Sequence, residues 1–184
     1  MTDTDSKFIL RAKFFAEAGH DSIGQTRKYT GEPYHVHIHE VGNIVMSVTN
    51  DVETIAAAFL HDLEEDVKGR YGLSYIHLRF GLEVRNLVEE LTDKYTPEHY
   101  PYLNRAERKV LEAWRISQTS SKAQTIKVAD LISNTRSIVD YDVGFARTYL
   151  LEKERMLAGL TKANPILLER AKQILTEAKE KVNI

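Results

Sequence analysis

Apolar residues recur at steps of three and four positions along most of the chain, which is the spacing of one face of an α-helix. In the first third, such stripes run over residues 8–16 and 38–48. Gly19 follows the first stripe and is predicted to end that helix, because glycine is common in the left-handed cap after a helix. Residues 20–34 contain two glycines and a proline with little periodicity, so a polar and cationic loop is predicted there.

The rest of the chain continues the helical pattern, with polar caps, glycine and proline between the stripes. Asp51 is predicted to cap a helix that runs on through residue 66, and Gly81 to separate two helices. The remaining helices are predicted over residues 74–80, 82–91, 104–116, 122–139 and 145–181, the last broken near Asn164-Pro165. No segment alternates as a β-strand does. The pattern therefore predicts an all-α protein with one domain over residues 1–184.

The amino-acid composition excludes several functional classes but says little about the fold. A length of 184 residues suits one domain with a sizeable core, and 42% hydrophobic with 28% charged residues is typical of a soluble globular protein. The formal charge of −2 gives no overall field that would attract nucleic acid, so an anionic ligand must be met by local basic groups. The chain has no cysteine, which excludes disulfides, thiolate zinc sites and a cysteine nucleophile.

The N-terminus and the hydropathy bear on where the protein works. Residues 1–6 are acidic and lack the basic and then apolar pattern of a signal peptide, and no apolar run is long enough to cross a bilayer. We therefore expect a cytoplasmic protein with neither a membrane nor a nucleic acid as its partner.

The segment from Ala56 to Asp66 combines an apolar helical run with a histidine and four acids at its end. If the helix is regular, Asp62 lies on the same stripe as Ile55 and Ala58 and points where core residues point. A carboxylate buried without a partner costs several kcal/mol and tends to take up a proton. A divalent cation would remove that cost, so His61 and Asp62 are predicted to be half of a metal site.

The other half of this predicted site must come from elsewhere in the chain. Asp130 interrupts an otherwise apolar helical segment, and His37 stands near the start of another helix, where His35 and His39 are equally placed by periodicity. Taken alone, a His-Asp pair is usually a surface feature and a mid-helix aspartate is usually solvated. Two imidazoles and two carboxylates together suit manganese, iron, cobalt or zinc better than calcium.

The order of these residues matches a known pattern. His37, then His61-Asp62, then Asp130 on a later helix resembles the HD superfamily of metal-dependent phosphohydrolases. Within it, the chain resembles the RelA/SpoT-type alarmone hydrolases, in particular the small single-domain ones, over roughly residues 7–180. The matching segments are Thr30 to His37, Thr54 to Asp66, Phe80 to Val84, Asn104 to Lys109, and Ile126 to Asp130 with Asn134 and Arg136.

The resemblance implies an HD-type helical bundle of about eight to ten helices. It implies that Mn²⁺ is bound by four ligands, His37, His61, Asp62 and Asp130. It also implies removal of the 3′-pyrophosphate from guanosine tetra- and pentaphosphate by metal-activated water, giving GDP or GTP. Catalysis would then fall to Glu65 and Asp66, and repulsion between these two carboxylates is expected to raise the pKa of one of them.

Candidate substrate contacts follow from the same comparison and from the charge balance. Arg27 and Lys28 lie in what looks like the basic loop of the family, and the other candidates are Asn134, Ser137, Arg147 and Tyr149. Three features depart from the family pattern and bear on substrate choice. They are one additional residue at Tyr29-Thr30, Ile38 where proline is usual, and Leu131 and Ser133 where arginine and histidine are usual.

Two alternatives to an alarmone hydrolase remain open from the sequence. The same site suits a phosphatase of NADPH or of another phosphorylated nucleotide. A non-enzymatic alternative is an antitoxin-like binding partner of an alarmone synthetase, although such a protein has no use for Glu65 and Asp66. The expected ligand is a small nucleotide in each enzymatic case, and the oligomeric state does not follow from the sequence.

Overall fold

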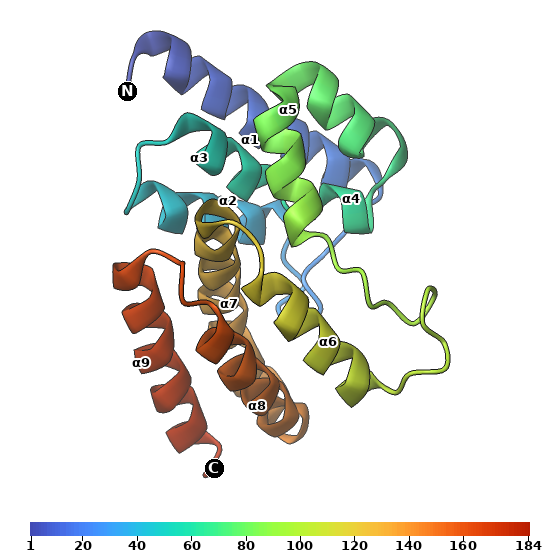
Figure 1. The fold of residues 1–184 in the computed structure, drawn as a ribbon, viewed down its shortest axis with the longest axis vertical. Helices are drawn as coiled ribbons and strands as arrows, with labels where there is room; N and C mark the ends of the chain where they lie inside the picture. The colour runs from blue at the N-terminus through green and yellow to red at the C-terminus, as the bar shows by residue number, and fades with distance from the viewer. The chain divides into compact units, whose positions relative to one another are not determined.

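A computed structural model of the chain describes the backbone of residues 1–184 and every side chain except those of Arg136 and Ser137. The chain divides into two compact units, residues 1–92 and 93–184 (Figure 1). A single domain over residues 1–184 would require the two units to pack together, so that part of the sequence analysis stays a prediction.

The first unit is built around one short and very apolar helix, α3 (Val52–Leu60). Residues 54–60 of α3 are all buried, and α1, α2 and α5 all pack against this helix. The other elements of this unit are α1 (Asp3–Ser22), α2 (His35–Met46), α4 (Leu63–Asp66), the 3-10 turn η1 (Gly69–Tyr71) and α5 (Leu73–Leu91). The most hydrophobic segment of the sequence therefore forms the centre of this unit.

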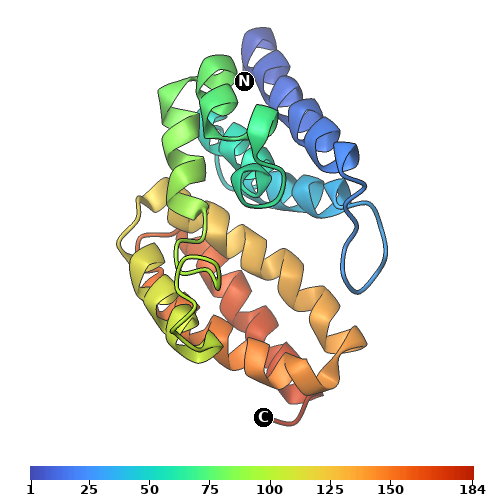
Figure 2. The same ribbon diagram turned by 90° about the vertical axis from the view of Figure 1, so that its right-hand side faces the viewer.

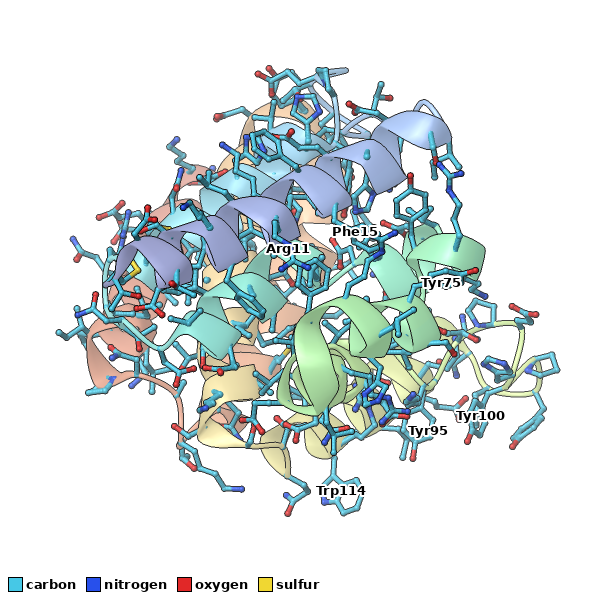
Figure 3. The ribbon with its side chains drawn as sticks, turned by 90° about the horizontal axis from the view of Figure 1, so that it is seen from above. Arg11, Phe15, Tyr75, Tyr95, Tyr100 and Trp114 are labelled. Atoms are coloured by element: carbon cyan, nitrogen blue, oxygen red, sulfur yellow. The ribbon has the colours of Figure 1, made fainter. Side chains whose placement is uncertain are left out.

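On the outer side of this unit, α1 and α5 contact each other through aromatic rings and through guanidinium groups that lie over these rings. The rings of Phe15 and Phe80 meet edge to face with centroids 5.5 Å apart. Arg79 lies over Phe15 at 5.2 Å, and Arg11 lies over Phe80 at 5.8 Å. Figure 3 shows Arg11 and Phe15 on the side of α1 that is turned toward α5. These contacts hold α1 against α5.

The second unit consists of α6 (Arg105–Ser117), α7 (Ser121–Tyr141), α8 (Val143–Gly159) and α9 (Pro165–Lys181). α8 packs against the other three helices, and α7 also packs along α9 (Figure 2). Residues 92–104, which carry two prolines, form no helix before α6, as the sequence predicts.

The all-α prediction is confirmed. Nine α-helices are present in the described part of the chain, which contains no strand, only an isolated bridge between Thr26 and Pro33. The predicted caps form as well: Asp51 accepts from the backbone N–H of Thr54, and Asn104 closes a capping box at the start of α6. None of the described helices is both long and apolar enough for a membrane span.

Gly81 is confirmed as a break, because its φ of +88° separates two helical segments within α5. Gly19 does not end the first helix, and that prediction is wrong. α1 continues to Ser22, and Gly19 is small for another reason: a Cβ there would lie 2.6 Å from Leu63 and 3.1 Å from Tyr71. The helix predicted to run on from Asp51 through residue 66 is interrupted between Leu60 and Leu63.

Replacement of Gly42 by alanine tests the packing of α2 on α3. A Cβ at Gly42 would overlap the ring of Phe59, so we expect Gly42→Ala to lower the free energy of unfolding by about 1–3 kcal/mol. Gly144→Ala is the matched control, because the nearest heavy atom to its Cβ is 3.9 Å away and alanine favours the helix by roughly 0.5–1 kcal/mol. Denaturant unfolding measures both; equal stability of the two variants would contradict the packing.

Candidate metal centre

Three of the predicted ligands meet within the first unit. His37 lies in the first turn of α2, His61 follows the last residue of α3, and Asp62 precedes α4. The side chains of both histidines are buried, with 1% of His37 and 3% of His61 exposed. One ligand atom from each of the three residues lies within 4.8 Å of the others. The interruption between α3 and α4 therefore coincides with the candidate centre.

The two imidazoles point toward the same carboxylate oxygen. The Nε2 atom of His61 lies 3.1 Å and that of His37 3.6 Å from Oδ2 of Asp62. The Nδ1–H of His61 donates to the carbonyl of Ala58 at 2.9 Å, and because a carbonyl only accepts, this bond places the proton on Nδ1. In the neutral ring, Nε2 of His61 is then the nitrogen with the lone pair, and a nitrogen and a carboxylate oxygen side by side are typical donors to a transition-metal ion.

The hydroxyl of Tyr34 supports this set from outside. It donates a hydrogen bond of 2.6 Å to Oδ2 of Asp62. Tyr34 also contacts His37 through its ring, with centroids 5.4 Å apart. Hydrogen bonds of this kind orient metal ligands and tune their basicity. Tyr34 was not predicted as a site residue; its place three residues before His37 was the one available sign.

The structure also separates the three histidines that periodicity left equivalent. Nδ1 of His35 lies 2.9 Å from Asp21, and Nε2 of His39 lies 2.5 Å from Glu17, so both of these rings face acids of α1. Only His37 of the three belongs to the cluster with Asp62. This arrangement favours His37 as the ligand.

Glu65 and Asp66 lie on α4, directly after the candidate ligands. The pKa of Asp66 is raised, although part of the residue is exposed. Partial burial of the carboxyl group is the larger cause, and the negative charge of Asp62 is the second. The main causes for Asp66 are thus its burial and Asp62, and the expected repulsion between Glu65 and Asp66 stays a prediction. The Asp66 carboxylate also accepts a hydrogen bond of 2.8 Å from the side chain of Gln25, which was not predicted as a site residue.

The basic loop after α1 is compact. The backbone N–H of Arg27 donates to Glu32 at 2.8 Å, and the Thr26–Pro33 bridge closes the loop at its base. The guanidinium of Arg27 lies 3.7 Å from Glu40, and the ammonium of Lys28 lies over the ring of Tyr29. The loop thus presents Arg27 and Lys28 from the same unit that holds the histidines.

The remaining predicted residues belong to the second unit. Asp130 is buried on α7, where it lies 2.9 Å from the ammonium of Lys127 and accepts a 2.6 Å hydrogen bond from Asn134. Asn134, predicted to contact substrate, is thus tied to the predicted ligand. Tyr149 is half-buried and Arg147 is exposed on α8, while the side chain of Ser137 lies outside the described residues. Asp130 as the fourth ligand stays a prediction.

Comparison with known proteins agrees with this cluster of histidines and aspartate. Residues 12–139 match the HD domain family. The chain belongs to that family. It is 36% identical over 138 residues to the guanosine-3′,5′-bis(diphosphate) 3′-pyrophosphohydrolase MESH1 of Xenopus tropicalis, which covers 73% of this chain and 72% of the relative. The Mus musculus protein of that name is 31% identical over 177 residues, 92% of this chain and 93% of its own.

A solved structure agrees as well. It is described as a metazoan ortholog of SpoT that hydrolyses ppGpp and plays a role in starvation responses. Its TM-score with this HD domain protein is 0.79 at 26% sequence identity, covering 92% of this chain and 94% of that chain. The HD-type helical fold implied by the sequence resemblance is therefore confirmed.

Removal of the Tyr34 hydroxyl tests how the centre is supported. Tyr34→Phe takes away the hydrogen bond to Asp62, so we expect Mn²⁺ affinity to fall by about tenfold while the fold is kept. Titration of the purified protein with Mn²⁺ measures the change. Tyr29→Phe is the control, because its hydroxyl lies 3.3 Å from the ammonium of Lys28 in the basic loop and Tyr29 is not one of the clustered residues. Equal affinities for the two variants would show that Tyr34 does not support the ligand.

Proposed function

We propose that the protein is a manganese-dependent 3′-pyrophosphohydrolase of guanosine tetra- and pentaphosphate. The buried cluster of His37, His61 and Asp62, with two further acids on α4, is the observation that carries the proposal. The relatives named as 3′-pyrophosphohydrolases of guanosine-3′,5′-bis(diphosphate) support it, since two of them match over 73% and 92% of this chain. The protein would act on a small nucleotide in the cytoplasm, without nucleic acid or membrane as a partner.

His37, His61, Asp62 and Asp130 would hold the ion. The ammonium of Lys127 now contacts Oδ2 of Asp130. If that oxygen is to bind the ion, Lys127 must move away, because the ammonium and the metal ion would compete for it. Mn²⁺ held by these residues would supply a water of lowered pKa and a positive charge for a phosphate group. The ligand set of two imidazoles and two carboxylates fits manganese among other transition metals.

Glu65 and Asp66 would handle the protons of the reaction. The water oxygen forms a bond to the phosphorus that carries the 3′-oxygen, the bond to that oxygen breaks, and pyrophosphate departs. An aspartate with a raised pKa accepts the water proton more readily than an ordinary one, which suits Asp66 as a general base. The departing 3′-oxygen must gain a proton, so that GDP or GTP leaves as the alcohol.

Substrate charge would be met locally, because the chain as a whole carries −2. Arg27 and Lys28 would bind phosphate groups from the basic loop. Asn134, Ser137, Arg147 and Tyr149 remain the proposed contacts from the second unit with ribose, base or phosphate.

A nucleotide phosphatase, for example of NADPH, is the second candidate function. It would use the same ligands, and the additional residue at Tyr29-Thr30 in the basic loop favours a different fit of the substrate. A panel of nucleotides with separate assays for phosphate and pyrophosphate distinguishes the two reactions. Phosphate from NADPH without pyrophosphate from guanosine tetraphosphate would favour this candidate.

Purified protein loaded with Mn²⁺ is expected to release pyrophosphate from guanosine tetraphosphate. Chelation should stop the release and added Mn²⁺ should restore it, because the metal supplies the activated water. Turnover that continues unchanged after the metal has been removed would contradict the proposal.

Asp130→Ala is expected to lower both metal content and turnover, the latter by about a hundredfold or more, because it removes a proposed ligand. Asp140→Ala is a matched control on the same helix, where Asp140 is exposed and pairs loosely with Lys181 at 3.6 Å. Metal content is measured on the same samples as turnover. If both variants keep metal and activity, Asp130 is not a ligand.

Glu65→Gln separates catalysis from metal binding. The amide keeps the size of the side chain but can neither take up nor deliver a proton as a carboxyl group does, so turnover should fall by about 10²–10⁴-fold with metal content unchanged. Loss of metal in this variant would move Glu65 into the ligand set. The variant also tests the antitoxin-like alternative, in which protection of cells from an alarmone synthetase would not need this carboxylate.

A further inference from the structure

The side chain of Gln25 bridges two residues that lie far apart in the sequence. Its Nε2 donates to Oδ2 of Asp66 at 2.8 Å, and its Oε1 lies 2.6 Å from Nδ1 of His20. His20 is fully buried in the last turn of α1, whereas Asp66 ends the short helix α4. The bridge therefore connects a fixed point of the core with a short and partly exposed element.

Only one arrangement of protons satisfies this bridge. An ionised carboxylate accepts and cannot donate, so the amide NH₂ of Gln25 must face Asp66. The amide oxygen then faces His20, whose Nδ1 must carry the proton. Burial lowers the pKa of His20, which agrees with a neutral ring protonated on Nδ1 alone.

Gln25 also lies at the base of the basic loop. Its backbone N–H donates to the carbonyl of His20 at 3.1 Å, and its own carbonyl accepts from the N–H of Tyr34 at 3.0 Å. Tyr34, at the other end of the loop, donates its hydroxyl to Asp62. Both ends of the loop that carries Arg27 and Lys28 are thus bonded to acids around the candidate centre.

We propose that Gln25, held in place by His20, is a positioning residue that fixes the carboxylate of Asp66 beside the metal centre. The proposal rests on the proposed function, in which Asp66 takes the proton of the attacking water. A carboxylate at the end of a four-residue helix has several rotamers open to it. Misplacement of a reacting group by about 1 Å costs on the order of a hundredfold in rate.

A double-mutant cycle between Gln25 and Asp66 tests this role. Gln25→Glu keeps the shape of the side chain but faces Asp66 with a second acceptor, and Gln25→Leu removes the polar group. We expect each to lower kcat for guanosine tetraphosphate by about 10–100-fold, with KM and Mn²⁺ content close to those of the natural protein. In an Asp66→Asn background, the same changes at Gln25 should have little further effect, because Gln25 acts through Asp66.

Variants of His20 provide the rescue experiment. His20→Asn keeps an N–H near the position of Nδ1 and should retain most of the kcat, whereas His20→Leu should resemble Gln25→Leu. Gln173→Leu is the matched control, since Gln173 also donates to a carboxylate, Glu177, but on the exposed face of α9. It should leave kcat unchanged.

Nuclear magnetic resonance gives a readout that does not depend on activity. The buried proton on Nδ1 of His20 should appear as a slowly exchanging resonance in the natural protein and be lost or shifted in Gln25→Leu. Effects of Gln25 and Asp66 that multiply in the cycle, or a natural protein without that resonance, would overturn the inference. A fully active Asp66→Asn variant would instead overturn the catalytic role of Asp66 in the proposed function.

Discussion

The first unit depends on the placement of one carboxylate, that of Asp62, between two buried imidazoles. Such a group is unfavourable in a protein interior unless hydrogen bonds or a cation compensate its charge. The structure supplies a hydrogen bond from the hydroxyl of Tyr34, and the Nε2 atoms of His37 and His61 face the same oxygen, where a bound cation would compensate the remaining charge. The chain departs from a regular helix at this point, because α3 ends at Leu60 and α4 begins at Leu63. Charge, hydrogen bonding and the helix break are therefore parts of one arrangement.

The same arrangement explains why three helices of the unit pack around the short helix α3. A metal centre requires ligands that hold their positions when the ion leaves or the substrate arrives. The apolar length of α3, packed against α1, α2 and α5, gives His61 a rigid base, and the carbonyl of Ala58 sets the direction of its ring. A small residue allows the close approach of α2, since Gly42 leaves no room for a Cβ beside the ring of Phe59 on α3. Stability and function thus draw on the same contacts.

The sequence predicted the helices and their caps well, but it predicted the tertiary contacts around the site poorly. The helical periodicity and the capping residues Asp51 and Asn104 predicted the elements, because those signals are local. Gly19 was misread because its small size serves a tertiary contact with Leu63, which no local pattern reveals. Periodicity could not choose among the histidines around His37; the choice depends on acids of α1 that bind the other two. Gln25 and Tyr34 were missed for the same reason, since their partners lie about thirty to forty residues away.

The three clustered residues His37, His61 and Asp62 all come from one continuous half of the chain, and that half has a core of its own. During synthesis on the ribosome, N-terminal units generally fold first. The imidazoles and the carboxylate can therefore assemble once Thr92 has emerged, well before α7 is made. In this order of synthesis, the three clustered side chains are all present in the chain before Asp130 on α7 has been translated.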